Sequence, residues 1–337
     1  MNKYIKKFKT LEQLEDYIFG PDYVTPNLLY VEGTGTVGSK KLEPLTFTIS
    51  SGGDCPREEK GGELRNEGCG KIELFIPAEI TSNQFLYVEY SVDGGETWER
   101  YTVPDDIHED VSFGPCNLNQ GDSVMFRGKG STLVTITAPE SELEQDDRGV
   151  DNEDYVNCTF QFENVNEAEC HGDVMSLLQL PLDIFEEIER KNTKSTSDVG
   201  QFWDLFSDAP ITTMPNLPKN IYMIGSAENY QGMFNNTFIE DIILPEKYVP
   251  SGCYDYMFES CNNILNITIL AEEWEDDMIP ENMFQNSNIF GKMINLYIPS
   301  KMFSWYQDQG FISQYWHVED YKTGEVLQEG EEPQQAL

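Results

Sequence analysis

The chain has 337 residues, of which 39% are apolar and 12% aromatic, so it is long enough for two or three domains with hydrophobic cores. Its 60 acidic and 22 basic residues give a formal net charge of -38, which excludes nucleic-acid binding through a general basic surface. No run of about 18 apolar residues occurs, so no membrane span is predicted. We interpret the acidity as a highly solvated surface. Calcium binding is the alternative, although no EF-hand loop supports it.

The N-terminal segment, residues 1–38, begins with a basic arm that contains no acid. A predicted short helix over 10–18 and a predicted strand over 28–31 follow the arm. Because no apolar stretch comes after the basic residues, a signal peptide is not predicted, and the chain is expected to be non-secreted or exported by another route. The segment is a candidate attachment site for an acidic partner, and a frayed cationic terminus is the alternative. The basic residues are Lys3, Lys6, Lys7 and Lys9.

Residues 39–138 show apolar residues at every second position, separated by Gly- and Asp-containing turns. This pattern is typical of short antiparallel strands, and it predicts a β-sandwich of the immunoglobulin-like kind. The fold class is therefore mainly β with short helices. Strands are predicted over residues 45–49, 72–76, 85–90, 98–103, 123–127 and 132–136.

One turn in this region matches the Asp-box of sialidases and related propellers. An aspartate and a threonine there can satisfy backbone groups of a tight turn, and a tryptophan packs beneath it. The box occurs once, whereas propellers repeat it, so we expect a structural hairpin and no catalysis. The hairpin residues are Ser91, Asp93, Gly95, Thr97 and Trp98.

The rest of the chain divides by composition. Eight acids against one arginine mark a solvated linker, and a highly polar tail is expected to be disordered unless something outside the chain holds it. The predicted segments are an acidic linker at 139–156, a connecting strand and helix at 157–200, a repeat domain at 201–322 and a polar tail at 323–337.

The repeat domain contains a recurring hydrophobic-Phe pair. The pairs are separated by 28, 24 and 26 residues, and short runs of alternating apolar residues follow them. A period of this size is typical of a solenoid, in which each unit contributes one strand and stacks on its neighbours. Such a unit builds a surface and not a catalytic pocket. The predicted spine consists of Phe206, Met233, Phe234, Met257, Phe258, Met283 and Phe284.

No catalytic, cofactor-binding or metal-binding residue is predicted. His108, His171 and His317 are far apart in sequence and share no metal-ligand spacing. The seven cysteines include no Cys-x-x-Cys pair, so a zinc site is not predicted, and most are expected to be reduced thiols. Nucleophile-elbow, Walker and dinucleotide motifs are all missing.

Segments 251–264 and 209–218 resemble the BspA-type leucine-rich repeats of Bacteroidetes and their phages, whose members carry a Cys-Tyr-x-x-Met-Phe core and a Leu-Thr-x-x-Pro step. The resemblance rests on Cys253-Tyr-Asp-Tyr-Met-Phe258 and on Ala209-Pro-Ile-Thr-Thr-Met-Pro-Asn-Leu-Pro218. Segments 90–98, 121–128 and 171–178 are similar to the β-rich module that precedes such repeats. The opening, 8–17 and 26–31, resembles virion proteins of crAss-like phages. The resemblance implies a head fiber or capsid decoration protein, located in virions assembled in the host cytoplasm.

The same resemblance implies the partners: other virion subunits, further copies in a dimer or trimer, and a host surface glycan or protein. The repeats depart from the family pattern, because no cysteine precedes Met283-Phe284 and Asn229-Tyr-Gln-Gly232 replaces Cys-Tyr. Two alternatives remain open. One is an exported bacterial surface adhesin with the same repeats, and the other is a glycan-active enzyme that uses the Asp-box.

Overall fold

The structure is a computed structural model that describes residues 5–8, 28–31, 35–37, 42–54, 68–81, 88–102, 109–128, 134–137, 154–177, 202–217, 230–245, 248–249, 252–274, 279 and 282–332. Over these residues the fold is mainly β with short helices, as the sequence predicts. The helices predicted over 10–18 and 182–190, and the linker up to residue 153, lie outside the described residues.

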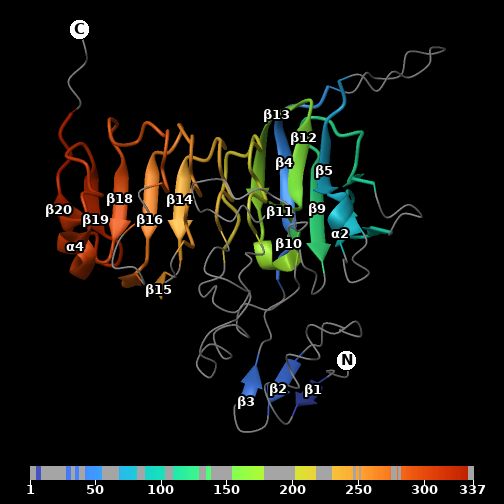
Figure 1. The fold of residues 1–337 in the computed structure, drawn as a ribbon, viewed down its shortest axis with the longest axis horizontal. Helices are drawn as coiled ribbons and strands as arrows, with labels where there is room; N and C mark the ends of the chain where they lie inside the picture. The colour runs from blue at the N-terminus through green and yellow to red at the C-terminus, as the bar shows by residue number, and fades with distance from the viewer. Residues whose placement is uncertain are drawn as a thin grey trace, which may run out of the picture.

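Two antiparallel sheets form what we call the two-sheet body (Figure 1). Each predicted strand of residues 39–138 corresponds to an observed one, with shifted ends. The larger sheet has the order β13 (Val165–His171), β4 (Leu45–Gly52), β9 (Ser123–Gly128), β6 (Val88–Ser91) and β7 (Glu99–Arg100). The smaller sheet has the order β12 (Thr159–Glu163), β5 (Lys71–Ile76) and β8 (Val111–Phe113).

The two sheets pack face to face because each strand turns alternate side chains inward. Leu45, Phe47 and Ile49 of β4 are buried, whereas the residues between them are half-buried. The ring of Phe47 lies 4.9 Å from that of Phe160 on the opposite sheet, and Phe160 lies 5.0 Å from Phe126 of β9. These three rings form the centre of the two-sheet core.

The predicted boundary at residue 138 is wrong, because β12 and β13 complete the two sheets. Segment 157–200 is therefore not simply a connector. The strand β13 escaped prediction because outward acids such as Glu167 and Glu169 dilute its apolar pattern. The end of the predicted linker is also strand: β11 (Asp154–Asn157) pairs with β10 (Val134–Thr137).

Two small elements lie outside the main sheets. The single turn α2 (Ala78–Thr81) follows β5. Near the N-terminus, β1 (Ile5–Phe8), β2 (Leu28–Val31) and β3 (Gly35–Val37) form a separate three-stranded sheet. The predicted strand over 28–31 is therefore confirmed as β2, and Lys6 and Lys7 lie in β1, whereas Lys3 and Lys9 lie outside the described residues.

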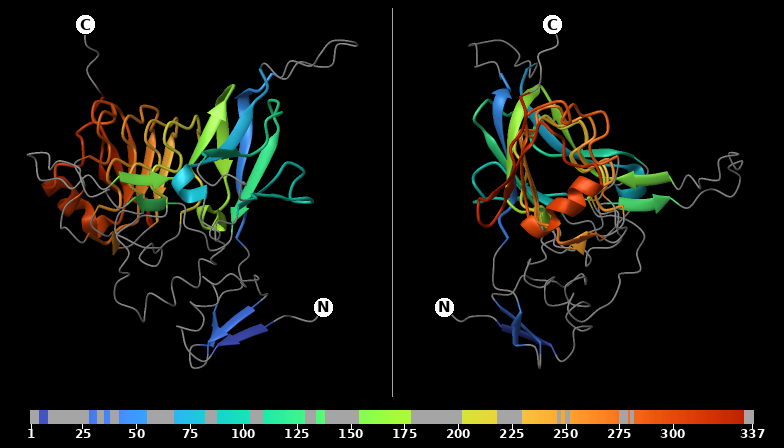
Figure 2. Two further views of the ribbon diagram at one scale, coloured as in Figure 1. Left: turned by 45° about the vertical axis from the view of Figure 1, so that its right-hand side comes forward. Right: turned by 90° about the vertical axis from the view of Figure 1, so that its left-hand side faces the viewer.

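The described residues between 202 and 320 form stacked turns that we call the coil stack. Viewed along the stack, successive coils overlie one another (Figure 2). One parallel sheet contains β14 (Asp241–Leu244), β16 (Asn266–Ile269), β18 (Asn295–Ile298) and β19 (His317–Asp320), and β20 (Val326–Gln328) adds to its edge antiparallel. A second, two-stranded parallel sheet pairs β15 (Tyr248–Val249) with β17 (Glu273–Trp274).

A ladder of stacked phenylalanine rings runs through the coil stack. Phe206 stacks on Phe234 at 5.3 Å, Phe234 on Phe258 at 5.7 Å, and Phe258 on Phe284 at 5.5 Å. The residue before each later ring is a methionine whose carbonyl accepts the N–H of the preceding ring residue, as from Phe234 to Met257. All seven predicted spine residues are buried.

A left-handed turn residue follows each ring of the ladder by two positions. Asp208, Asn236, Ser260 and Asn286 all have φ between 54° and 59°. Asp, Asn and Ser are short polar residues, and Asp and Asn tolerate this conformation better than other non-glycine residues. The Asn236 side chain donates to the Asp208 carboxylate at 2.7 Å, which joins neighbouring coils at this corner.

The C-terminal end of the stack is closed by η2 (Ser300–Met302), α4 (Phe303–Asp308) and β20. Asp320 is buried and accepts backbone N–H groups from Ser300, Lys322 and Thr323. The hydrogen bonds from Ser300 and Thr323 hold its carboxyl pKa well below the usual range. The predicted polar tail therefore does not need an outside partner for order up to residue 332, because the chain itself holds it.

The ring ladder predicts a large effect of one truncation. Phe234→Ala removes a fully buried ring stacked on both sides, so we expect a loss of about 3–5 kcal/mol in the free energy of unfolding, measured by chemical denaturation. Phe238→Ala is the matched control, since its ring is 41% exposed and outside the ladder, and about 1 kcal/mol or less is expected. Equal losses in both variants would contradict the assignment.

Candidate functional surface

The coil stack is joined directly to the two-sheet body at the open edges of both sheets. Ile211 forms a parallel bridge with Ala168 of β13, the edge strand of the larger sheet. Phe160 of β12, the edge strand of the smaller sheet, donates its N–H to the Leu205 carbonyl at 2.9 Å. The first coil thus covers two edges that would otherwise expose unpaired backbone groups.

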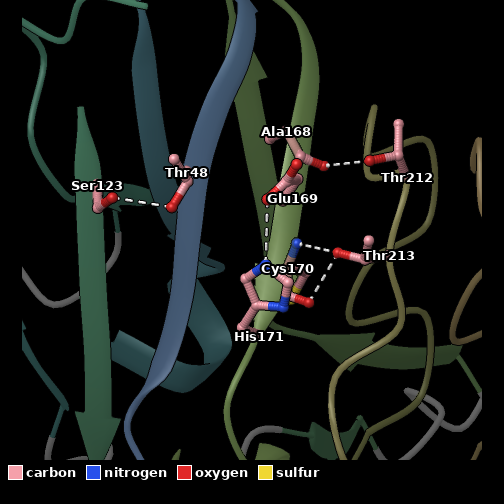
Figure 3. A network of polar contacts seen from close by, with 8 residues as sticks. All are labelled: Thr48, Ser123, Ala168, Glu169, Cys170, His171, Thr212 and Thr213. Carbon is pink, nitrogen blue, oxygen red and sulfur yellow. Dashed lines mark hydrogen bonds and ion pairs between the residues drawn. The ribbon is translucent and has the colours of Figure 1, made fainter. Parts of the chain in front are cut away.

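Threonine side chains reinforce this junction (Figure 3). The Thr213 hydroxyl accepts the N–H of Cys170 at 2.6 Å and donates to the Cys170 carbonyl at 2.9 Å. The Thr212 hydroxyl donates to the Ala168 carbonyl at 3.3 Å. These hydroxyl bonds add to the backbone bonds from the Ala168 N–H to the Pro210 carbonyl and from the Thr212 N–H to the Ala168 carbonyl, both at 2.9 Å.

A buried aspartate secures the far end of the same junction. Asp173, 2% exposed, accepts the N–H of Glu43 at 2.8 Å through Oδ2 and the side-chain amide of Asn216 at 3.2 Å through Oδ1. Asn216 also forms a bridge with Asp173 through the backbone. The Asp173 side chain consequently connects the start of β4, the end of β13 and the first coil.

The junction makes one hydrophobic core and one continuous outer surface. Buried residues from Leu45 to Val318 form a single cluster. On the outer face, the hydroxyls of Thr48 in β4 and Ser123 in β9 are hydrogen-bonded (Figure 3). On the same face of β13, His171 Nε2 lies 3.2 Å from Glu169 Oε2. This outer surface continues from the larger sheet onto the coil stack.

On the coil stack the outer surface carries a ladder of amides. The Asn295 side chain donates to Asn266 at 2.7 Å, and Asn266 donates to Asp241 at 2.5 Å. These hydrogen bonds between side chains of neighbouring strands restrain all three side chains. Beside it lie Ile243, 55% exposed, and the half-buried Tyr297. The surface is polar with isolated apolar and aromatic groups, a composition that suits an extended interface with another molecule.

The predicted hairpin has the geometry of an Asp-box. Asp93 accepts the backbone N–H of Thr97 and bonds the hydroxyls of Ser91 and Thr97, and these bonds hold its pKa well below the usual range. The Ser91 hydroxyl accepts the Gly95 N–H at 2.9 Å, and the Trp98 indole donates to the Gly95 carbonyl at 3.0 Å. Every polar group of the motif is used to hold the turn.

The hairpin is tied to the larger sheet by a cation. The Arg127 guanidinium lies 3.7 Å from the centre of the Trp98 ring and 2.7 Å from the Glu89 carboxylate. Such a pair orders both the ring and the turn. The Asp93 carboxylate therefore stabilises the turn, and its oxygens are engaged in hydrogen bonds within it.

A cleft of about 500 Å³ lies over β12, beside the first coil, and its lining includes Glu73, Gln161 and Asp204. Burial, followed by the nearby Asp208 carboxylate, raises the pKa of Asp204 to about 6. Asp204 has a left-handed backbone (φ 49°), and its carboxylate lies where a side chain on Gly232 would have to go. The cleft is acidic and open, and it places no histidine, cysteine or serine–histidine pair beside the perturbed carboxyl.

The remaining reactive residues are distributed over the fold. Cys69 is disulfide-bonded, whereas five cysteines are free thiols: Cys116, Cys158, Cys170, Cys253 and Cys261. Within the described ranges, no three His, Cys, Asp or Glu side chains are grouped as a metal site would require. His171 and His317 lie in different sheets, and His108 is outside the described residues. No helix in the described part of the chain is long and apolar enough to cross a membrane.

No family model, curated protein or solved structure matches this chain.

The junction hydrogen bonds predict the effect of a nearly isosteric change. Thr213→Val keeps the shape of the side chain but leaves the Cys170 N–H without its acceptor, so a loss of about 1–3 kcal/mol is expected by urea denaturation. Thr268→Val, on the outer face of β16, is the control and should change stability by about 0.5 kcal/mol. A small effect at both sites would show that the junction does not depend on Thr213.

The raised pKa of Asp204 predicts a stabilising substitution. The folded state favours the protonated carboxyl, so its stability is greatest below the unfolded pKa of about 4 and falls as the pH rises to about 6. Asp204→Asn removes the charge, and asparagine tolerates the left-handed backbone. At pH 8 we expect a gain of about 1–2 kcal/mol that shrinks towards pH 4.

The control for this substitution is Thr268→Val, which changes a half-buried side chain of the coil stack without adding or removing a titratable group. The stability of this variant relative to the wild type should not vary with pH over the same range. A gain at Asp204→Asn that is equal at pH 4 and pH 8 would contradict a titration of Asp204.

Proposed function

We propose that the protein is a non-enzymatic structural protein of a phage virion, either a head fiber or a capsid decoration protein. The observation that carries the proposal is the single core from Leu45 to Val318, which makes the two-sheet body and the coil stack one rigid, elongated unit. A rigid unit with a long outer surface is suited to holding a binding face at a fixed distance and orientation from an attachment point.

The finer fold assignment belongs to the same proposal. We infer that the two-sheet body is an immunoglobulin-like β-sandwich, and that the coil stack is a short leucine-rich-repeat solenoid of the BspA type. The ring ladder from Phe206 to Phe284 and the parallel strands β14, β16 and β18 support the solenoid assignment. The antiparallel sheets that pack through Phe47 and Phe160 support the sandwich assignment.

Attachment is assigned to the N-terminal segment, with its lysines at positions 3, 6, 7 and 9. A basic arm on a body of net charge -38 favours an acidic docking surface on a capsid or fiber subunit, or on another copy in a dimer or trimer. The outer surface of the coil stack is then left for a host surface glycan or protein. Binding in this scheme is passive and uses no cofactor.

The structural use of the Asp-box argues against the glycan-active alternative, because Asp93 is engaged with Ser91 and Thr97. One observation favours the other alternative, an exported bacterial surface adhesin. Cys69 is disulfide-bonded, and disulfides persist mainly in oxidising compartments. An adhesin would use the same outer surface but would stay on the cell after export.

The virion proposal predicts where the protein accumulates. Mass spectrometry of phage particles purified by density-gradient centrifugation should detect the chain at many copies per particle, in a constant ratio to the major capsid protein. Host cells without phage provide the control for contamination.

The opposite result is equally informative. If the chain is found only in infected cytoplasm, a virion role is ruled out. If protease treatment or surface labelling of intact, uninfected bacteria detects it, the exported adhesin replaces the virion protein as the assignment.

A further inference from the structure

The C-terminal strand β20 is held against the end of the coil stack by its pairing with β19 and by additional polar contacts. The Gln328 side chain donates to the carbonyls of Ser313 and Trp316, both at 2.9 Å. The Glu331 N–H donates to the Gln314 carbonyl at 2.9 Å. Val326 is 44% exposed, whereas Leu327 packs against the hydrophobic core, so both apolar and polar contacts dock this three-residue strand.

A histidine lies between two carboxylates at this site. Nε2 of His317, in β19, is 2.8 Å from the Glu319 carboxylate of the same strand. Its Nδ1 is 3.3 Å from the carboxylate of Glu329, which directly follows β20. The first contact lies within one strand, whereas the second joins the docked segment to the body of the stack.

The protonation state of the imidazole decides whether both contacts are hydrogen bonds. A neutral imidazole has one N–H and can donate to one carboxylate, whereas a protonated imidazole donates from both nitrogens. The neighbour of His317 in register on β18 is the uncharged Asn295, whose side chain donates to Asn266. The charged groups that face the ring are therefore Glu319 from β19 and Glu329 from the docked segment.

We propose that His317 is a proton-operated latch, which holds residues 323–332 on the coil stack more tightly at mildly acidic pH than at alkaline pH. Histidine is the side chain that changes charge between about pH 5 and 8, whereas glutamates stay ionised there. The latch thus holds both contacts when the ring is protonated and only one when the ring is neutral. The inference does not depend on the proposed function.

The latch should be modest in strength, since the Glu329 side chain is 81% exposed and water screens its charge. Hydrogen exchange of the full-length protein, corrected for intrinsic exchange rates, measures it locally. From pH 7.5 to pH 5.5 we expect protection of amides in 323–332 to rise about threefold relative to amides of β16. Normalisation to β16 removes the general effect of neutralising an acidic protein.

Three variants test the mechanism. His317→Gln and Glu329→Gln should both abolish the relative rise, since each removes one side of the contact between β19 and the docked segment. His171→Gln is the matched control: His171 also contacts a glutamate, Glu169, but on its own strand and away from the C-terminal end. This control should keep the threefold rise.

A wild-type rise that persists in His317→Gln overturns the proposal, and so does its loss in His171→Gln. A rise that survives Glu329→Gln also overturns it, because the protonation would then act without the contact between β19 and the docked segment. Protection of β16 amides in each variant reports whether the coil stack is still folded.

Discussion

The whole molecule depends on the pairing of the first coil with the open edges of the two sheets. A two-sheet body of this kind ends in strands whose outer backbone groups need partners, and here Ala168 of β13 and Phe160 of β12 find them in residues 205–212. The same pairing gives the first coil a sheet edge to lie against. Without it, the body would present two exposed edges and the first coil would have no template to stack on.

The ring ladder shows how coils of unequal length can stack regularly. Rings from Phe206 to Phe284 keep centroid distances of 5.3–5.7 Å, close to the strand spacing of about 4.8 Å in a sheet. The repeat length varies, yet ring and strand positions stay in register.

Much of this architecture could be predicted from the sequence, but the connection between its parts could not. The Met-Phe pairs predict the ladder, because large apolar side chains that recur at a nearly constant period are typical of stacked repeats. The strand β13 could not be predicted, because the pairing of Ala168 and Cys170 with residues 211–213 involves backbone and hydroxyl groups that leave no periodic signal. The Asp-box residues were assignable since every contact from Asp93 falls within five residues of chain.

The antiparallel strand β20 has a consequence for how the molecule can vary in size. The stack has two unlike ends, a templating edge at β13 and a terminating strand at β20, and the coils between them repeat the same ring and strand contacts. Gain or loss of one internal coil would change the length of the protein by about 4.8 Å and leave both ends intact. The length of the outer surface is therefore set by the number of coils.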